Sequence, residues 1–145
     1  MSTRNVTDCP QGVRFLPAQY LIDIENGVVR TTFRGALTRC DVADYAARLR
    51  DDPAFRPHFF ELITFEANPD IQLGYLDWHS LADHDPFFDR SKRAFVTHSG
   101  TALYGMIRMF QMARNDPDNI RIFETTEEAM LWLSSPLGFA RAEGR

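Results

Sequence analysis

The densest group of side chains able to bind a metal ion or transfer a proton lies in DWHSLADHD, residues Asp77–Asp85. His79 and Asp83 are four residues apart and would share one face of a helix, with His84 and Asp85 just beyond them. A metal site needs three or four converging ligands and neighbouring groups that hold them, and no pattern here guarantees either. A metal-dependent enzyme is therefore one hypothesis for this segment. We assign no residue as a metal ligand, because a polar helix end in water explains the same residues.

Nucleophilic and acid–base chemistry have less support. His98 directly precedes Ser99, and adjacent residues of a strand point to opposite faces, so His98 is poorly placed to activate Ser99. The sequence contains no G-x-S-x-G motif. Nothing in it brings together two of the carboxylates that fall on predicted strands, namely Asp23, Glu25, Glu61 and Glu66. We therefore predict no catalytic residue, no cofactor and no enzymatic activity.

The turn in THSGTALYG is a weaker candidate, for binding an anion. Ser99, Gly100 and Thr101 connect a predicted strand to a helix whose first N–H groups would face the turn. The lysine of a phosphate-binding loop is missing from this pattern. The same residues are also typical of an ordinary turn in which Ser99 or Thr101 caps the helix, and both interpretations stay open.

Composition limits the classes of partner. The chain has 145 residues, of which 44% are hydrophobic and 25% charged, and its net charge is -4. These values are typical of one globular domain with no general attraction to nucleic acid or to anionic membranes. The one basic run, Arg90–Arg93, lies next to acidic residues and is interpreted as the solvated start of a strand.

Two features favour a cytoplasmic location. Cys9 and Cys40 lie far apart in the sequence, without the spacing of a disulfide framework or a zinc site. The N-terminus lacks the apolar run of a signal peptide, and no stretch approaches the about 18 apolar residues of a membrane-spanning helix. We expect neither a disulfide nor an integral membrane segment.

Hydrophobic periodicity predicts a single α/β domain over residues 17–137, between a flexible N-terminal arm (1–16) and a short tail (138–145). QYLIDIENGVVRTTFRG alternates as two strands would, and Asn26-Gly27 supplies a tight hairpin turn. Helical segments then alternate with apolar strands, which predicts a mixed sheet covered by about four helices. Helices are predicted to begin just after Thr38, at Asp70, at Thr101 and just after Thr125. The later strands are predicted to span residues 58–65, 92–98 and 119–125.

The order of these elements, with four landmarks, resembles the SpoIIAA-like proteins, the STAS domain (sulfate transporter and anti-sigma-factor antagonist) and its Sec14-like bacterial relatives. The landmarks are VVRTTFRGALTRCDV, DDPAFRPHFFELITF, AFVTHSGTALYGMIRMFQM and IFETTEEAMLWL. The resemblance runs from about Gln19 to Leu133 and implies a small cytoplasmic domain that binds proteins or lipid-type ligands. STAS switch proteins carry a phosphorylated Ser after the central strand. The corresponding segment here, EANPDIQLGYL (66–76), contains neither Ser nor Thr, so we expect no such serine switch.

The helix predicted over Thr101–Asn115 holds three methionines. Met109 and Met112 widen its apolar arc to about 220°, roughly twice what packing against one sheet requires. Three interpretations remain for these two side chains: a neighbouring helix covers them, they line a ligand groove, or they form a partner surface. The candidate binding residues are Met109, Met112, Tyr104, Tyr75 and Trp78, with Phe87 as a further candidate for a ligand site.

We therefore expect a non-enzymatic binding module. The first hypothesis is a protein partner, including a second copy of this chain in a homodimer, because flexible thioethers adapt to varied surfaces. The second hypothesis is an apolar, lipid-like small molecule held between helices, as in the Sec14-like relatives.

Overall fold

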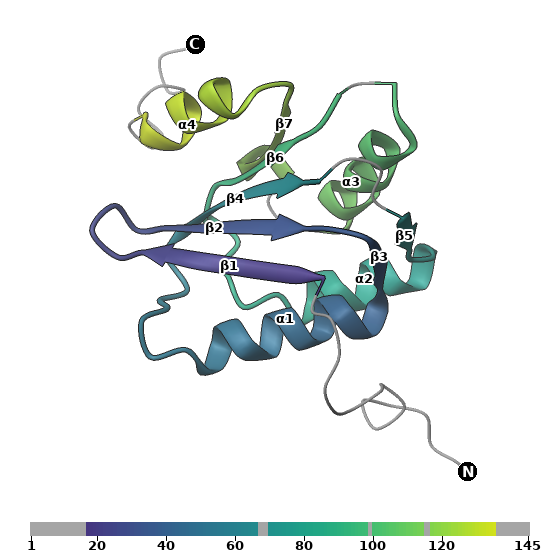
Figure 1. Cartoon of the computed structure of the whole chain (residues 1–145), viewed down its shortest axis with the longest axis horizontal. Coiled ribbons are helices and arrows are strands. Elements are labelled where there is room, and N and C mark those ends of the chain that lie inside the picture. The colour runs from purple at the N-terminus through teal and green to yellow at the C-terminus, as the bar shows by residue number, and fades with distance from the viewer. Residues whose placement is uncertain (1–16, 67–69, 99, 115–116, 136–145) are drawn as a thin grey trace.

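The computed structural model describes residues 17–66, 70–98, 100–114 and 117–135 of the chain. These residues form an α/β domain with one mixed five-stranded sheet and four α-helices (Figure 1), which confirms the predicted fold class. The predicted N-terminal arm and C-terminal tail lie outside the described residues, as does Ser99 of the candidate anion-binding turn.

The main sheet combines one antiparallel edge strand with four parallel strands, in the order β1-β2-β4-β6-β7. Its strands are β1 (Ala18–Asp23), β2 (Val28–Phe33), β4 (Phe60–Phe65), β6 (Arg93–Val96) and β7 (Ile120–Phe123). A short parallel ladder pairs β3 (Ala36–Thr38) with β5 (Asp70–Gln72). Gly27 closes the β1–β2 turn with φ +66°, a backbone conformation that favours glycine, as the Asn26-Gly27 pair predicted.

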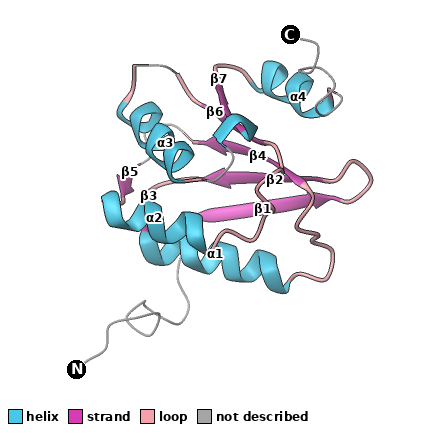
Figure 2. Ribbon diagram, turned by 180° about the vertical axis from the view of Figure 1, so that it is seen from behind, coloured by secondary structure: helices cyan, strands magenta, loops and turns pink. Residues whose placement is uncertain are grey.

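Three helices cover one face of the main sheet and the fourth covers the other face (Figure 2). The helices are α1 (Arg39–Asp51), α2 (Tyr75–Asp83), α3 (Ala102–Ala113) and α4 (Thr126–Ser134). The first three share the larger apolar core with the sheet, whereas α4 packs on a smaller cluster centred on Leu62 and Ala94. The large core and any space within it therefore lie between the sheet and α1, α2 and α3.

Threonine caps fix where three of these helices begin. Thr38 accepts a hydrogen bond from the N–H of Asp41, whose carboxylate accepts the N–H of Thr38 at 2.8 Å. This reciprocal pair is a capping box, and it starts α1 directly after Thr38, as predicted. Thr101 and Thr125 each accept the N–H three residues later and so cap α3 and α4.

The helix predicted to begin at residue 70 begins at Tyr75 instead, so that prediction is wrong over its first turn. Asp70–Gln72 forms β5 because its backbone pairs with β3. Gly74 then becomes the N-cap of α2, and its N–H donates to the Asp77 carboxylate at 2.8 Å. The sequence suggested a helix by its apolar spacing, but pairing with a segment more than thirty residues away decides the backbone here.

The basic run ending at Arg93 is not the solvated strand entrance that its charge suggested. Ser91, Lys92 and Arg93 are 2%, 4% and 6% exposed. The ammonium group of Lys92 donates to the carbonyl of Trp132 at 2.8 Å, at the end of α4. Each buried cation therefore has protein acceptors in place of water, which is the condition for burying a charge.

The expectation of no disulfide is also wrong, because Cys40 in α1 is disulfide-bonded. Cys9 lies outside the described residues. A cytoplasmic location thereby loses one of its two supporting arguments, since disulfides are rare in reducing compartments. Among the described residues, no helix has both the length and the apolar character needed to cross a membrane.

Candidate functional site

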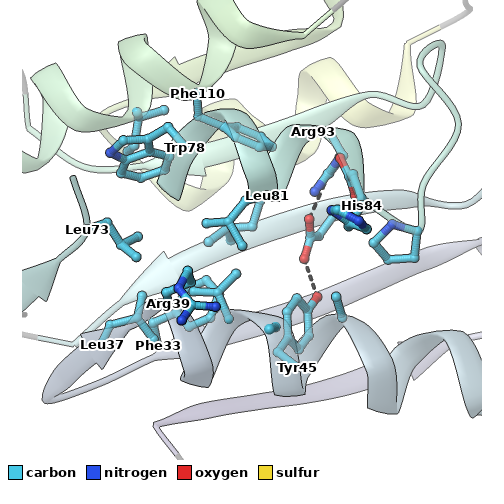
Figure 3. Close-up of a pocket in the computed structure, with 18 of the residues that line it drawn as sticks. Phe33, Leu37, Arg39, Tyr45, Leu73, Trp78, Leu81, His84, Arg93 and Phe110 are labelled. Carbon is cyan, nitrogen blue, oxygen red and sulfur yellow. Dashed lines mark hydrogen bonds and ion pairs between the residues drawn. The ribbon is translucent and has the colours of Figure 1, made fainter. Parts of the chain in front are cut away.

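A cavity of about 320 Å³ lies between the main sheet and the helices α1, α2 and α3 (Figure 3). The sheet contributes aromatic and branched side chains from β2, β4 and β6, among them Phe33, Ile63 and Phe95. Trp78 of α2 and Phe110 of α3 close the opposite wall, with ring centroids 6.0 Å apart. The volume lies at the lower end of the roughly 300–1,000 Å³ of small-molecule pockets, and the lining is mainly apolar as in such pockets.

Small side chains on α1 leave the space that forms the cavity mouth. Val42, Ala43, Ala46 and Ala47 line it at the three- and four-residue spacing of one helix face. Arg39 and Arg50 stand on the same face at the two ends of this apolar row.

The opposite side of the mouth comes from α2, where the exposed Ser80 and the half-buried Leu81 line the cavity. Two contacts join the helices across the mouth. Arg39 pairs with Asp77 at 3.6 Å, and Arg50 donates to the carbonyl of His84 at 3.0 Å. The cavity-lining residues that are exposed to solvent are Arg50, Ser80 and His84, so the cavity opens between α1 and α2, with an arginine at each end of the mouth.

One end of the cavity is polar and is built around Glu61. This β4 carboxylate is 2% exposed and accepts hydrogen bonds from three side chains. Tyr45 of α1 and Thr31 of β2 donate to Oε2, Thr31 at 2.9 Å, and Arg93 of β6 donates to Oε1 at 2.8 Å. Figure 3 shows Tyr45 and Arg93 on one side of the cavity, each joined by a dashed line to the carboxylate of Glu61 between them.

The same network continues away from the cavity and balances its charge. Arg93 also pairs with Asp85, which in turn accepts from Arg114 at 2.8 Å. The side chains of Glu61, Arg93, Asp85 and Arg114 are all at least nine-tenths buried, and their two cations and two anions sum to zero. The Arg93 guanidinium stacks 4.3 Å above the centre of the Phe87 ring. Arg114 also donates to the half-exposed Asp89 at 2.9 Å, so this wall carries no excess positive charge and is already hydrogen-bonded.

The electrostatics of the network keep its donors protonated. Burial raises the pKa of Tyr45 well above its ordinary value, and the neighbouring Glu61 carboxylate raises it further. Burial alone would lower the pKa of Arg93, but the Asp85 and Glu61 carboxylates outweigh it and the pKa is raised. At neutral pH Tyr45 is therefore a neutral donor and Arg93 a cation.

Comparison with known proteins does not assign a function to this site. Comparison of the chain with protein-family models, with curated proteins and with solved structures gives no significant match. The site must therefore be interpreted from its own residues.

The residues predicted to form a binding site do not lie together in the structure. Trp78 and Phe87 line the cavity. Met109 is half-buried against the core, and Met112 is 76% exposed on α3. Neither methionine is among the cavity-lining residues, and the half-buried Tyr104 is not among them either. The side chain of Tyr75 lies outside the described residues. In the candidate anion-binding turn, Gly100 has φ +85° and Thr101 is the cap of α3.

The histidine and aspartate residues of Asp77–Asp85 do not converge. His79 and Asp83 are exposed, and the ring of the exposed His84 contacts the carbonyl of Ser80 at 2.9 Å. Asp85 instead points into the buried network and is held by two arginines. The described part of the chain contains no group of three His, Cys, Asp or Glu side chains arranged to hold a metal ion.

Sequence reasoning missed Tyr45, Glu61 and Arg93 as site residues. Glu61 and Ile63 alternate with Phe60 and Leu62 in a strand that is apolar on both faces. A lone carboxylate inside such a strand signals a buried partner, because an unpaired buried charge is costly. Arg93 is that partner and pairs with Glu61 in the β4–β6 register. The strand order was needed to bring the two together.

Proposed function

We propose that this protein is a non-enzymatic binding module that holds a small, largely apolar molecule in the cavity beneath α1, α2 and α3. This is the second of the three hypotheses drawn from the sequence, after a protein partner and before a metal-dependent enzyme. The observation that carries it is the 320 Å³ apolar cavity, which has walls from three helices and five strands and a mouth between α1 and α2. An apolar guest gains by leaving water and by contacting walls that otherwise lack partner atoms.

The chemistry of the walls supports binding in preference to catalysis. Glu61 is the carboxylate best shielded from water, yet its two oxygens accept three hydrogen bonds from fixed side chains. A carboxylate whose oxygens already accept these hydrogen bonds is poorly placed to remove a proton from a ligand. The network therefore supplies a shaped and rigid wall.

A protein partner, including a homodimer, is the second proposed function. The observation that favours it is Met112, a large apolar side chain that is 76% exposed on α3. Membership of the SpoIIAA-like group and a cytoplasmic location are further proposals. The hairpin followed by alternating strands and helices supports the first of them.

The neutral, apolar dye N-phenyl-1-naphthylamine tests the small-molecule proposal, because its fluorescence rises in apolar sites. We expect the fluorescence to rise with the wild-type protein and to stay low with Ala46→Phe, which places a ring in the mouth of the cavity. Ala102→Phe is the matched control, since Ala102 is exposed on α3 and does not line the cavity.

Both variants should melt near the wild-type temperature, because neither position is fully buried. A wild-type protein that leaves the dye dark would refute the proposal. Equal fluorescence with the wild type and a folded Ala46→Phe variant would also refute it, by placing the dye elsewhere.

A further inference from the structure

We propose that the cavity selects an apolar molecule with a terminal carboxylate, whose charged end binds Arg39 at the mouth between α1 and α2. This inference rests on the proposed function, because it names the class of ligand that the same cavity takes. It follows from the distribution of charge around an otherwise apolar lining.

The polar end of the cavity offers little to a charged ligand. Glu61, Asp85, Arg93 and Arg114 form a neutral set, and each of them is already paired within it. A ligand carboxylate placed there would lie beside Glu61 and would have to displace an existing ion pair of Arg93. Breaking a buried pair is strongly unfavourable, so the charged end of a ligand should avoid this wall.

Arg39 differs from Arg93 in exposure and in contacts. Its side chain is 41% exposed, so its guanidinium reaches both water and the cavity. Within the described part of the chain it makes no hydrogen bond, and its ion pair with Asp77 Oδ1 spans 3.6 Å. The other oxygen of Asp77 accepts the N–H of Gly74, which holds that carboxylate at the start of α2. The donors of Arg39 therefore remain available for a carboxylate, which a guanidinium binds with two parallel hydrogen bonds.

The position of Arg39 fits a head group at the mouth and a tail inside. Arg39 lies beyond the C-terminal end of β2, after β3, whereas Arg93 is the first residue of β6; because β2, β4 and β6 are parallel, the two arginines lie toward opposite ends of the strands. Figure 3 shows Arg39 near Leu37 and Phe33, across the cavity from Arg93. A ligand with its carboxylate at Arg39 would extend its tail over Phe33 and Ile63 toward Tyr45.

The other arginine at the mouth is less suited to this role. Arg50 lies at the C-terminal end of α1 and donates to the carbonyl of His84 at 3.0 Å. A carboxylate at Arg50 would also approach the partial negative charge at the C-terminus of the helix. Arg39 stands at the N-terminal end of α1, where the helix dipole favours an anion.

The cavity volume sets the size of the tail. At roughly 20–30 Å³ for each non-hydrogen atom, with a water molecule occupying about 30 Å³ of liquid, the space holds about 11–16 such atoms, so the dye, with about 17, would fill it out to the mouth. A saturated carboxylate of about ten carbons fits this range. Decanoate is therefore the probe, and decan-1-ol and decyltrimethylammonium are matched molecules with a neutral and a cationic head.

The experiment is displacement of N-phenyl-1-naphthylamine by these three molecules from the wild type, Arg39→Gln and the control Arg108→Gln. Arg108 is exposed on α3 and does not line the cavity, so its substitution changes the net charge equally without touching the site. We expect Arg39→Gln to weaken decanoate about tenfold, as for one charge-assisted hydrogen-bonded pair at a partly exposed site. Decan-1-ol should change less than twofold, and Arg108→Gln should match the wild type.

Added salt provides a second readout that a structural role of Arg39 would not move. Decanoate should weaken with rising ionic strength in the wild type and much less in Arg39→Gln, while decan-1-ol stays constant. Equal losses of decanoate and decan-1-ol in Arg39→Gln would overturn the inference, as would a selective loss in Arg50→Gln with Arg39→Gln unaffected. In either case decan-1-ol still displaces the dye and the proposed function stands. Failure of the dye to bind the wild type would refute the proposed function itself.

Discussion

Replacing Glu61 with Gln removes one charge from the buried network while keeping the shape of the side chain. The wild-type set holds two cations and two anions. The variant leaves Arg93 and Arg114 to share the buried Asp85, and the half-exposed Asp89 is a further partner of Arg114 only, so the buried part of the network keeps a net positive charge at Arg93. Arginine does not lose its proton in proteins, and therefore the network cannot regain neutrality by titration.

The magnitude follows from this imbalance. Removing one partner of a buried ion pair costs about 3–5 kcal/mol, against a total stability of about 5–15 kcal/mol. With a urea m-value of about 2 kcal/mol/M, the unfolding midpoint should fall by roughly 1.5–2.5 M. Glu66→Gln is the matched control, because Glu66 is 51% exposed and lies 3.8 Å from Arg34. Its free energy of unfolding should change by no more than about 0.5 kcal/mol.

A second substitution separates charge balance from simple loss of contacts. Adding Arg93→Met to Glu61→Gln leaves Asp85 paired with Arg114, which also contacts Asp89, so no buried cation is left without a buried anion. The double variant should therefore be more stable than Glu61→Gln alone, with a coupling energy of at least about 2 kcal/mol. Urea titrations followed by far-UV circular dichroism measure both midpoints. A double variant that loses the sum of the two single effects would refute the charge-balance argument.

Two further outcomes concern single residues. Met112→Glu should change the free energy of unfolding by no more than about 0.5 kcal/mol, because Met112 is exposed. Met109→Glu should lower it by about 1–3 kcal/mol, because Met109 packs on the core. If Met112 forms a partner surface, sedimentation will show loss of association in Met112→Glu alone. The pKa of Tyr45 is raised on folding, so its contribution is intact below pH about 10 and is lost as pH rises through its folded pKa, by about 1.4 kcal/mol per pH unit. Urea titrations above pH about 10 should show a shallower fall for Tyr45→Phe than for the wild type, and identical slopes would count against a buried, neutral Tyr45.

The local signals in the sequence predicted most of the fold. The Asn26-Gly27 turn, the Thr38 capping box and the Thr125 cap are decided by neighbouring residues, and all three are present in the structure. The short β3–β5 ladder was not predicted, because pairing across a long sequence separation leaves no local period. Asp70–Gln72 looked helical for the same reason.

The candidate site was predicted less well, because its chemistry depends on strand order. Glu61 and Arg93 are thirty-two positions apart and meet only because β4 and β6 are neighbours in the sheet. Charge alone suggested that Arg93 was solvated. The three methionines drew attention to α3, but the space lies on the side of α1, where Ala43, Ala46 and Ala47 are small. A cavity forms where side chains are too small to fill the space between elements, and no sequence motif marks such a place.

The network and the cavity are linked by the way the helices are held. Tyr45 ties α1 to β4 through Glu61, and Asp85, just after α2, joins Arg93 of β6 to Arg114 after α3. All three helices are therefore fastened to the sheet at the polar end of the cavity. Closing the cavity would require α1 to move toward α2, and the buried ionic contacts of Glu61 and Asp85 resist that movement. A ligand then enters a site that is already shaped, so less of its binding free energy is lost to reorganisation of the protein.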